Sequence, residues 1–196
     1  MSKVAIKGAD TGTGIFTLES PATNTDRTLV LPDEAGTVLT SGTPTVLPKG
    51  VPAFRAELQT STSISTGTWT LVPLSTSVFD TSSCFDTSTY KYTPNVAGYY
   101  CFIGNVRVGA GSPAQYYSAI NKNSTGFNTG SVITAAGSSV GAVTTAPQTS
   151  MSTIVYMNGT TDYVCLLGYL EGTSPFFDYN PIGFCNFLSG FLVRAT

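Results

Sequence analysis

Histidine is absent from this chain of 196 residues. Because histidine is the commonest general base and the commonest metal ligand, its absence excludes Ser-His-Asp and Cys-His catalysis. The four cysteines are too widely spaced for a zinc site: Cys84, Cys101, Cys165 and Cys185. We therefore predict no catalytic, cofactor-binding or metal-binding residue, and we expect a protein that is not an enzyme.

Charged residues are also scarce, at 10% of the chain, against roughly 25% in an average globular domain. The nine basic residues are scattered and the net charge is −2, so we expect no binding to nucleic acid or to an anionic membrane. Ser, Thr, Asn and Gly must supply the polar surface instead. Such a surface suits a protein that is buried in an assembly or that faces the outside of a particle.

Long apolar runs are missing as well. No segment approaches the roughly 18 apolar residues of a transmembrane helix, so we expect no membrane insertion. Residues 1–8 lack the apolar core of a secretory signal peptide. We therefore expect synthesis in the cytoplasm, where thiols stay reduced, and we expect the cysteines to be free and buried.

What the chain does contain is the pattern of an all-β protein. Hydrophobic residues make up 41% of it, enough for a core. Short apolar runs alternate with clusters of Gly, Pro, Asn and Ser, as in a sandwich or barrel. Nine strands are expected: 53–58, 67–73, 89–93, 98–108, 115–121, 131–136, 148–157, 162–171 and 184–194. This number suits a jelly roll.

Three of these expected strands are apolar on both faces: 98–108, 162–171 and 184–194. A strand with solvent on one side normally alternates apolar and polar residues, so a second layer must cover the outer face. We interpret that layer as a neighbouring subunit. The alternative is cover from within the same chain.

The stretch 123–160 carries no charged residue. Solvated surfaces and edge strands normally carry charge, so this stretch is expected to be an interface or a neutral loop. Within it, we expect residues 150–157 to be an interior strand and residues 137–147 to be a loop.

Residues 1–42 form a separate expected unit, a small β-hairpin module. Segments 14–19 and 27–31 alternate like strands, and turn-forming residues link them. A β-hairpin of this size is only marginally stable by itself, so we expect it to anchor on another protein. Its apolar residues are the anchoring candidates: Ile15, Phe16, Leu18, Leu29 and Leu31. Residues 43–51 are expected to be a proline-rich linker, and residues 52–196 the main domain.

Four motifs of the main domain, in order, resemble the C1q-like family. Residues 52–58 (PAFRAEL) are similar to its first strand, and residues 78–80 (VFD) to the Phe-Asp step that follows. Residues 92–102 (YTPNVAGYYCF) are similar to its pattern aromatic-x-Pro-x-x-x-Gly-x-Tyr-x-Phe, and residues 187–193 (FLSGFLV) to its last strand. The resemblance implies a C1q/TNF-like jelly-roll sandwich that forms a homotrimer along aromatic strand faces.

This resemblance gives five candidate residues for the core or for the three-fold contact. It leaves open which of these residues lie in the core and which lie at the three-fold contact: Tyr99, Phe102, Tyr163, Tyr169 and Phe191.

Residues 27–38 (RTLVLPDEAGTV) resemble a short module that recurs in bacteriophage tail fibres and other virion proteins. Its pattern is Thr-x-Thr-Leu-Pro-Asp-x-x-Gly-Thr, here with Leu29 where Thr is common, and the match covers residues 8–40. An animal C1q-like protein would carry a signal peptide and usually a collagen stretch, and neither is expected here.

The resulting hypothesis is a trimeric virion protein on a tail or capsid surface, made in the host cytoplasm. Residues 1–42 would bind other virion proteins, and the knob (residues 52–196) would bind a host-surface glycan or protein. Two alternatives remain open: a capsid decoration protein, and a free lectin- or cytokine-like binding module.

Two kinds of side chain are candidates for ligand binding in the knob. A set of aromatic residues includes some expected in loops, where they could stack on a sugar ring, although core or trimer packing is the alternative: Trp69, Tyr116, Tyr117, Phe176, Phe177 and Tyr179. Carboxylates near strand ends could line a Ca²⁺ site, although no segment resembles a calcium loop: Asp80, Asp86, Asp162 and Asp178.

Overall fold

The computed structural model describes residues 13, 24–26, 28, 51–139, 146–181 and 186–196. The chain divides into two compact units, Met1–Pro44 and Thr45–Thr196. The expected hairpin, its five anchoring candidates and almost all of the expected linker lie outside the described residues: Ile15, Phe16, Leu18, Leu29 and Leu31. The N-terminal module and its boundaries therefore stay a prediction.

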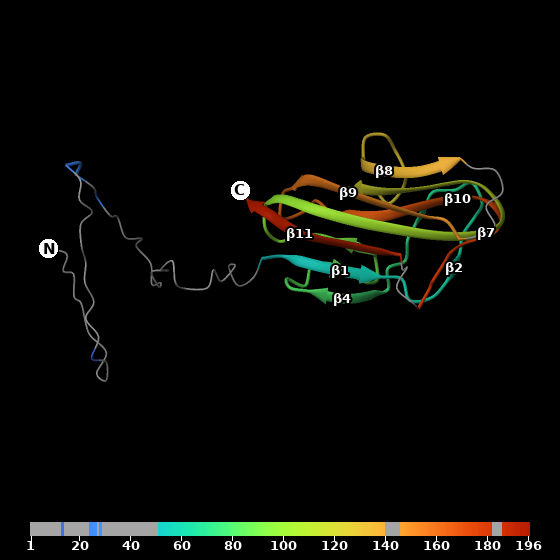
Figure 1. Cartoon of the computed structure of the whole chain (residues 1–196), viewed down its shortest axis with the longest axis horizontal. Coiled ribbons are helices and arrows are strands. Elements are labelled where there is room, and N and C mark those ends of the chain that lie inside the picture. The colour runs from blue at the N-terminus through green and yellow to red at the C-terminus, as the bar shows by residue number, and fades with distance from the viewer. Residues whose placement is uncertain (1–12, 14–23, 27, 29–50, 140–145, 182–185) are drawn as a thin grey trace. The chain divides into compact units, whose positions relative to one another are not determined.

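The described residues form strands and no helix (Figure 1). Eleven strands are present: β1 (Ala53–Glu57), β2 (Thr62–Ser63), β3 (Thr70–Leu71), β4 (Thr76–Asp80), β5 (Phe85–Asp86), β6 (Lys91–Tyr92), β7 (Gly98–Lys122), β8 (Val132–Ser139), β9 (Gln148–Met157), β10 (Val164–Phe177) and β11 (Phe187–Ala195).

The strands are arranged as two antiparallel sheets that share β7. In the first, sheet A, the order is β4-β1-β11-β7-β9. In the second, sheet B, β7 lies between β8 and β10, and β10 also pairs with β2, β3 and β6. Residues 98–107 of β7 belong to sheet A and residues 108–122 to sheet B. One long strand therefore joins the two layers.

The hydrophobic core lies between the two sheets. Phe54, Phe102 and Leu188 of sheet A are fully buried in one cluster with Ile120 and Leu166 of sheet B. Aromatic stacking adds to the packing, since the ring centroids of Phe54 and Tyr92 are 3.9 Å apart. The predicted all-β jelly-roll sandwich is confirmed.

Two of the sequence motifs meet in this core. Gly190 lies opposite Phe102, and a Cβ atom at Gly190 would lie 2.6 Å from Cδ1 of the Phe102 ring. Gly98 similarly admits the backbone carbonyl of Arg194. The Tyr100 hydroxyl donates a hydrogen bond of 2.9 Å to the Val96 carbonyl. The glycines of both motifs thus allow β7 and β11 to pack closely.

Several local expectations were wrong. The expected strands 98–108 and 115–121 are one strand, β7, and β8 continues to Ser139 where a loop was expected from residue 137. The expected strand 67–73 is reduced to the two residues of β3. Strand β9 pairs only with β7 among the described residues, so residues 150–157 form an edge strand and not an interior one.

Candidate functional site

The outer side of sheet A, which faces away from the core, exposes large hydrophobic residues. Side chains alternate along a strand, so the buried Tyr100 and Phe102 place Tyr99 and Ile103 on the outer side. We call this side the apolar face and define it by six residues with exposed fractions of 39% to 62%: Phe79, Tyr99, Ile103, Ile154, Tyr156 and Phe191.

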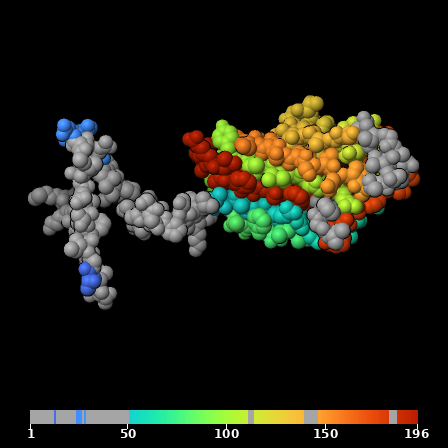
Figure 2. All heavy atoms as spheres, in the orientation of Figure 1, coloured from blue at the N-terminus to red at the C-terminus, as the bar shows by residue number. Residues whose placement is uncertain are grey.

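The strand register brings these residues together. Tyr99 pairs with Tyr156, and Cys101 lies between Ile154 on β9 and Phe191 on β11. The apolar face is therefore continuous across three neighbouring strands. Figure 2 shows this side of the molecule, with β4, β1, β11, β7 and β9 as successive bands of green, cyan, red, yellow-green and orange.

Several charged side chains lie on or beside this face. Arg194, opposite Tyr99 on β11, is exposed, whereas two other cations lie in ion pairs. Arg55 Nε lies 2.6 Å from Glu57 Oε1, and the Arg55 guanidinium lies 3.9 Å from the centroid of the Phe187 ring. Beside Tyr156, Lys122 Nζ lies 2.8 Å from Asp162 Oδ2. Pairing lowers the cost of covering charges with another apolar surface.

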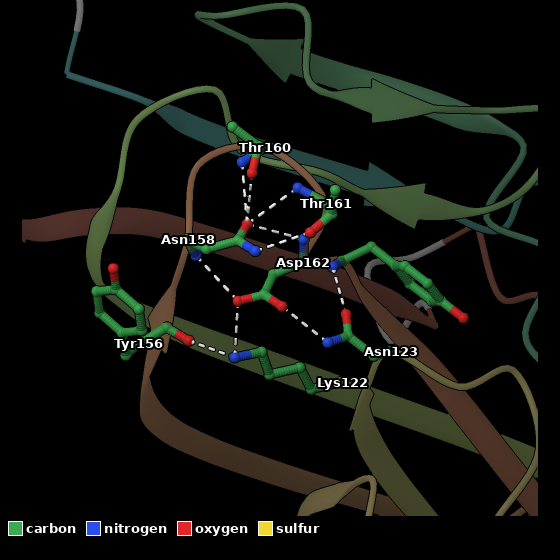
Figure 3. Close-up of polar contacts among 8 residues, drawn as sticks. Lys122, Asn123, Tyr156, Asn158, Thr160, Thr161 and Asp162 are labelled. Carbon is green, nitrogen blue, oxygen red and sulfur yellow. Dashed lines mark hydrogen bonds and ion pairs between the residues drawn. The ribbon is translucent and has the colours of Figure 1, made fainter.

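The loop between β9 and β10 is fixed by side-chain hydrogen bonds (Figure 3). Asn158 Oδ1 accepts hydrogen bonds from the backbone N–H groups of Thr160, Thr161 and Asp162, at 3.0, 2.9 and 2.9 Å. Lys122 Nζ also donates to the Tyr156 carbonyl at 2.8 Å. The loop therefore holds the end of β9 that carries Tyr156 on the apolar face.

Asp162 is the centre of that network and is almost fully buried. Its carboxylate accepts hydrogen bonds from Asn123 Nδ2 at 2.8 Å and from the Asn158 backbone N–H at 2.9 Å. Burial alone would raise the pKa of Asp162, but these hydrogen bonds and the Lys122 charge outweigh burial and lower the pKa. The sequence did not single out this network, because its only signal was a cluster of Asn and Thr in a turn.

The structure separates the candidates for core or three-fold contact. Phe102 is fully buried in the core, whereas Tyr99 and Phe191 are exposed on the apolar face. Tyr163 and Tyr169 are half-buried, and they lie on the outer side of sheet B.

On β10 the subunit interpretation was wrong. Cys165 and Leu167 point away from the main core, yet both are fully buried. The cover comes from the same chain, through Trp69, Leu71 and Val132. Among the described residues, no comparable layer covers the apolar face of sheet A.

The four carboxylates considered for a Ca²⁺ site do not come together as a set of metal ligands. Asp80 accepts a hydrogen bond from the Phe85 backbone at 2.7 Å, and Asp178 lies 2.6 Å from Arg107 Nε. Hydrogen bonds from Ser88 and Thr89 hold the pKa of Asp86 well below its usual range. No group of three metal-ligating side chains occurs within the described part of the chain.

The three described cysteines are free thiols, and the expected burial holds only for the last of them: Cys84, Cys101 and Cys165. Cys165 is fully buried, and burial raises its pKa to about 12. Cys84 and Cys101 are half-buried, and Cys101 lies on the outer side of sheet A.

No segment of the described chain forms a helix that could cross a membrane. No protein-family model matches the sequence, and no curated protein matches it.

Solved structures do match. The globular domain of zebrafish complement 1qA protein superposes with a TM-score of 0.55 at 14% identity, over 74% of this chain and 99% of that domain. The fold is that of a C1q/TNF-like jelly roll. Eiger TNF from S. frugiperda gives a TM-score of 0.54 at 7% identity, over 74% of this chain and 93% of that one. Murine APRIL at pH 5.0 gives 0.53 at 10% identity, over 73% of this chain and 99% of that one.

Proposed function

We propose that this protein is a homotrimeric binding module whose subunits pack through the apolar face of sheet A. The observation that carries the proposal is the continuous patch of exposed hydrophobic residues on β7, β9 and β11. Soluble monomers rarely leave such a patch open to water, so it marks an interaction surface.

The trimeric state is supported by the C1q-like resemblance, which implies self-association along aromatic strand faces. The aromatic rings of Tyr99, Tyr156 and Phe191 lie on such a face. Aromatic residues are enriched at protein interfaces and contribute much of the binding free energy there.

The finer proposal concerns where the trimer works. Residues 27–38 resemble the module of bacteriophage tail fibres, and this supports a short fibre or spike on the virion surface. In this proposal residues 1–42 bind other virion proteins, and the knob attaches to the host surface. A trimer that decorates the capsid shell is the second candidate.

The oligomeric state is tested by light scattering of the full chain at micromolar concentration. We expect a mass three times the chain mass of 20.5 kDa. A stable protomer with the apolar face open to water would overturn the proposal.

The virion role is tested separately by electron microscopy of virions labelled with an antibody against the knob. Label on the tail supports the attachment role, and label over the shell supports decoration. A protein that is absent from purified virions contradicts both and leaves a free binding module.

A further inference from the structure

A second group of aromatic side chains lies on the outer side of sheet B, away from the apolar face. The Trp69 ring stacks on the Phe127 ring, with centroids 4.1 Å apart and planes inclined by 11°. Tyr169 and Tyr117 lie 5.6 and 6.3 Å from Trp69, and 5.8 Å from each other. We call these four residues the ring cluster.

Strand pairing and loop hydrogen bonds hold the ring cluster in place. Tyr117 and Tyr169 are paired residues of β7 and β10. Trp69 directly precedes β3, which pairs with β10 at Leu167. Gly137 on β8 lies opposite Tyr117 and leaves room for its ring, where a Cβ atom would meet Cδ1.

Phe127 comes from the loop between β7 and β8. Asn121 Nδ2 donates a hydrogen bond of 2.8 Å to the Gly126 carbonyl, and Ser124 Oγ donates another of 2.8 Å to the same atom. This network holds Phe127 over Trp69 while 41% of Phe127 stays exposed. A loop that only covered the core would not need to hold an aromatic ring in water.

The polar groups of the ring cluster are neutral. Among the described residues, the hydroxyl groups of Tyr117 and Tyr169 have no hydrogen-bond partner, and both side chains are half-buried. The loop that carries Phe127 and the whole stretch 123–160 contain no charged residue. The ring cluster thus offers aromatic faces next to tyrosine hydroxyls that can donate and accept hydrogen bonds.

We propose that the ring cluster binds a neutral saccharide. A sugar ring has an apolar face of C–H groups that stacks on aromatic rings, and hydroxyl groups that pair with the tyrosine hydroxyls. This inference deepens the proposed attachment function and rests on it, because it names the ligand class of the knob. Stacking on nucleic-acid bases would require a basic groove for the phosphates, and the nine basic residues are scattered.

Trp69 is the one tryptophan of the chain, so tryptophan emission reports directly on this site. The full-length protein is titrated with neutral hexasaccharides of glucose, galactose, mannose and N-acetylglucosamine. We expect at least one of them to change the Trp69 emission in a saturable way. The Phe127→Ala variant should weaken that binding about tenfold, because it removes a stacked ring.

Two further variants distinguish a direct contribution to saccharide binding from a contribution to the packing of the fold. The double variant Tyr117→Phe/Tyr169→Phe keeps both rings and removes only the hydroxyls, so affinity should fall severalfold while the melting temperature stays close to wild type. Tyr90→Ala removes a half-buried aromatic outside the ring cluster and should bind like wild type.

The saccharide site is overturned if none of the four hexasaccharides changes the emission at about 10 mM, ten times a weak dissociation constant of ~1 mM. It is also overturned if Phe127→Ala and Tyr90→Ala lose binding equally. These failures are distinct from failure of the proposed function. If the protein is a trimer on the virion but binds no saccharide, only the saccharide site is wrong. If it is a monomer that binds a saccharide, only the proposed trimer is wrong.

Discussion

The ring centroid of Tyr99 lies 5.7 Å from that of Tyr156, at an interplanar angle of 63°, across paired positions of β7 and β9. This is the edge-to-face arrangement that aromatic pairs prefer. Exposed fractions of 46% and 41% show that the pair is built on the protomer surface and not in its core. A preformed aromatic pair loses little side-chain entropy when a partner covers it, which favours an interface at this position.

Ile154→Lys should dissociate the trimer. Ile154 is the most exposed residue of the apolar face, at 62%, so the protomer fold depends little on it. In the trimer the change would remove about 2 kcal/mol of apolar burial and would desolvate a charge in each subunit. Sedimentation velocity should show protomers, with a circular dichroism spectrum like that of wild type.

The matched control is Ser65→Lys, which adds the same charge to an exposed loop outside sheet A. It should sediment as a trimer. If Ile154→Lys also remains trimeric, the apolar face is not the contact between subunits.

Phe102→Ala and Phe191→Ala should destabilise the protein in different ways. Phe102 is fully buried in the core, so its truncation should cost about 4 kcal/mol at any protein concentration. Phe191 is 45% exposed in the protomer, so its truncation should act mainly on subunit association. The melting temperature of the Phe191→Ala variant should therefore fall most at low protein concentration.

Thermal unfolding over a hundredfold range of protein concentration distinguishes the two. Equal concentration dependence for both variants would mean that Phe191 supports the protomer core as Phe102 does.

Tyr99, Tyr100 and Phe102 show what the sequence could predict and what it could not. Alternation along the strand predicts that Tyr99 lies on one face of β7 and that Tyr100 and Phe102 lie on the other, and this part of the prediction holds. Alternation cannot tell which side is the core. The core side is the one that packs against sheet B, through residues far away in the sequence such as Leu166.

The same limit explains the error on β10. Its apolar outer residues correctly indicated a covering layer, but the pattern does not say which layer. Leu71 covers Leu167 through a short β3–β10 pairing that no local signal encodes. A strand that is apolar on both faces can therefore be covered by its own chain, as β10 is, or can leave one face exposed, as β7 does in sheet A.

Strand β7 was divided in the prediction because residues 109–114 contain glycine and proline, which normally break strands. In the structure Gly109 pairs with Phe176 and Gly111 with Thr173, so β10 continues the pairing through this region. The Phe176 ring occupies the space over Gly109, where a Cβ atom would lie 2.5 Å from the ring. Tertiary contact thus overrides the local turn signal.

Asp162→Asn should remove part of the acid sensitivity of the protomer. The folded-state pKa of Asp162 is lowered below an ordinary value of about 3.9, so ionised Asp162 stabilises the fold above that value. This stabilisation is lost as the pH falls through the lowered pKa. The variant should lose about 2 kcal/mol at neutral pH, with a smaller deficit in acid.

The measurement is urea unfolding from pH 7 to pH 3, with and without Asp162→Asn, in the Ile154→Lys background, so that subunit dissociation does not contribute. If the two stability curves run parallel over this whole range, the charge of the Asp162 carboxylate is not part of the network's stabilisation.

Cys101 should report the covering of the apolar face through its chemical reactivity. Its position between Ile154 and Phe191 means that any partner seated on the face also covers its thiol. Iodoacetamide labelling followed by peptide mass spectrometry should find Cys101 protected in the wild-type trimer and labelled in Ile154→Lys. Cys165 should stay protected in both proteins, because it is fully buried and its pKa is raised to about 12. Equal labelling of Cys101 in both proteins would place the subunit contact elsewhere on the knob.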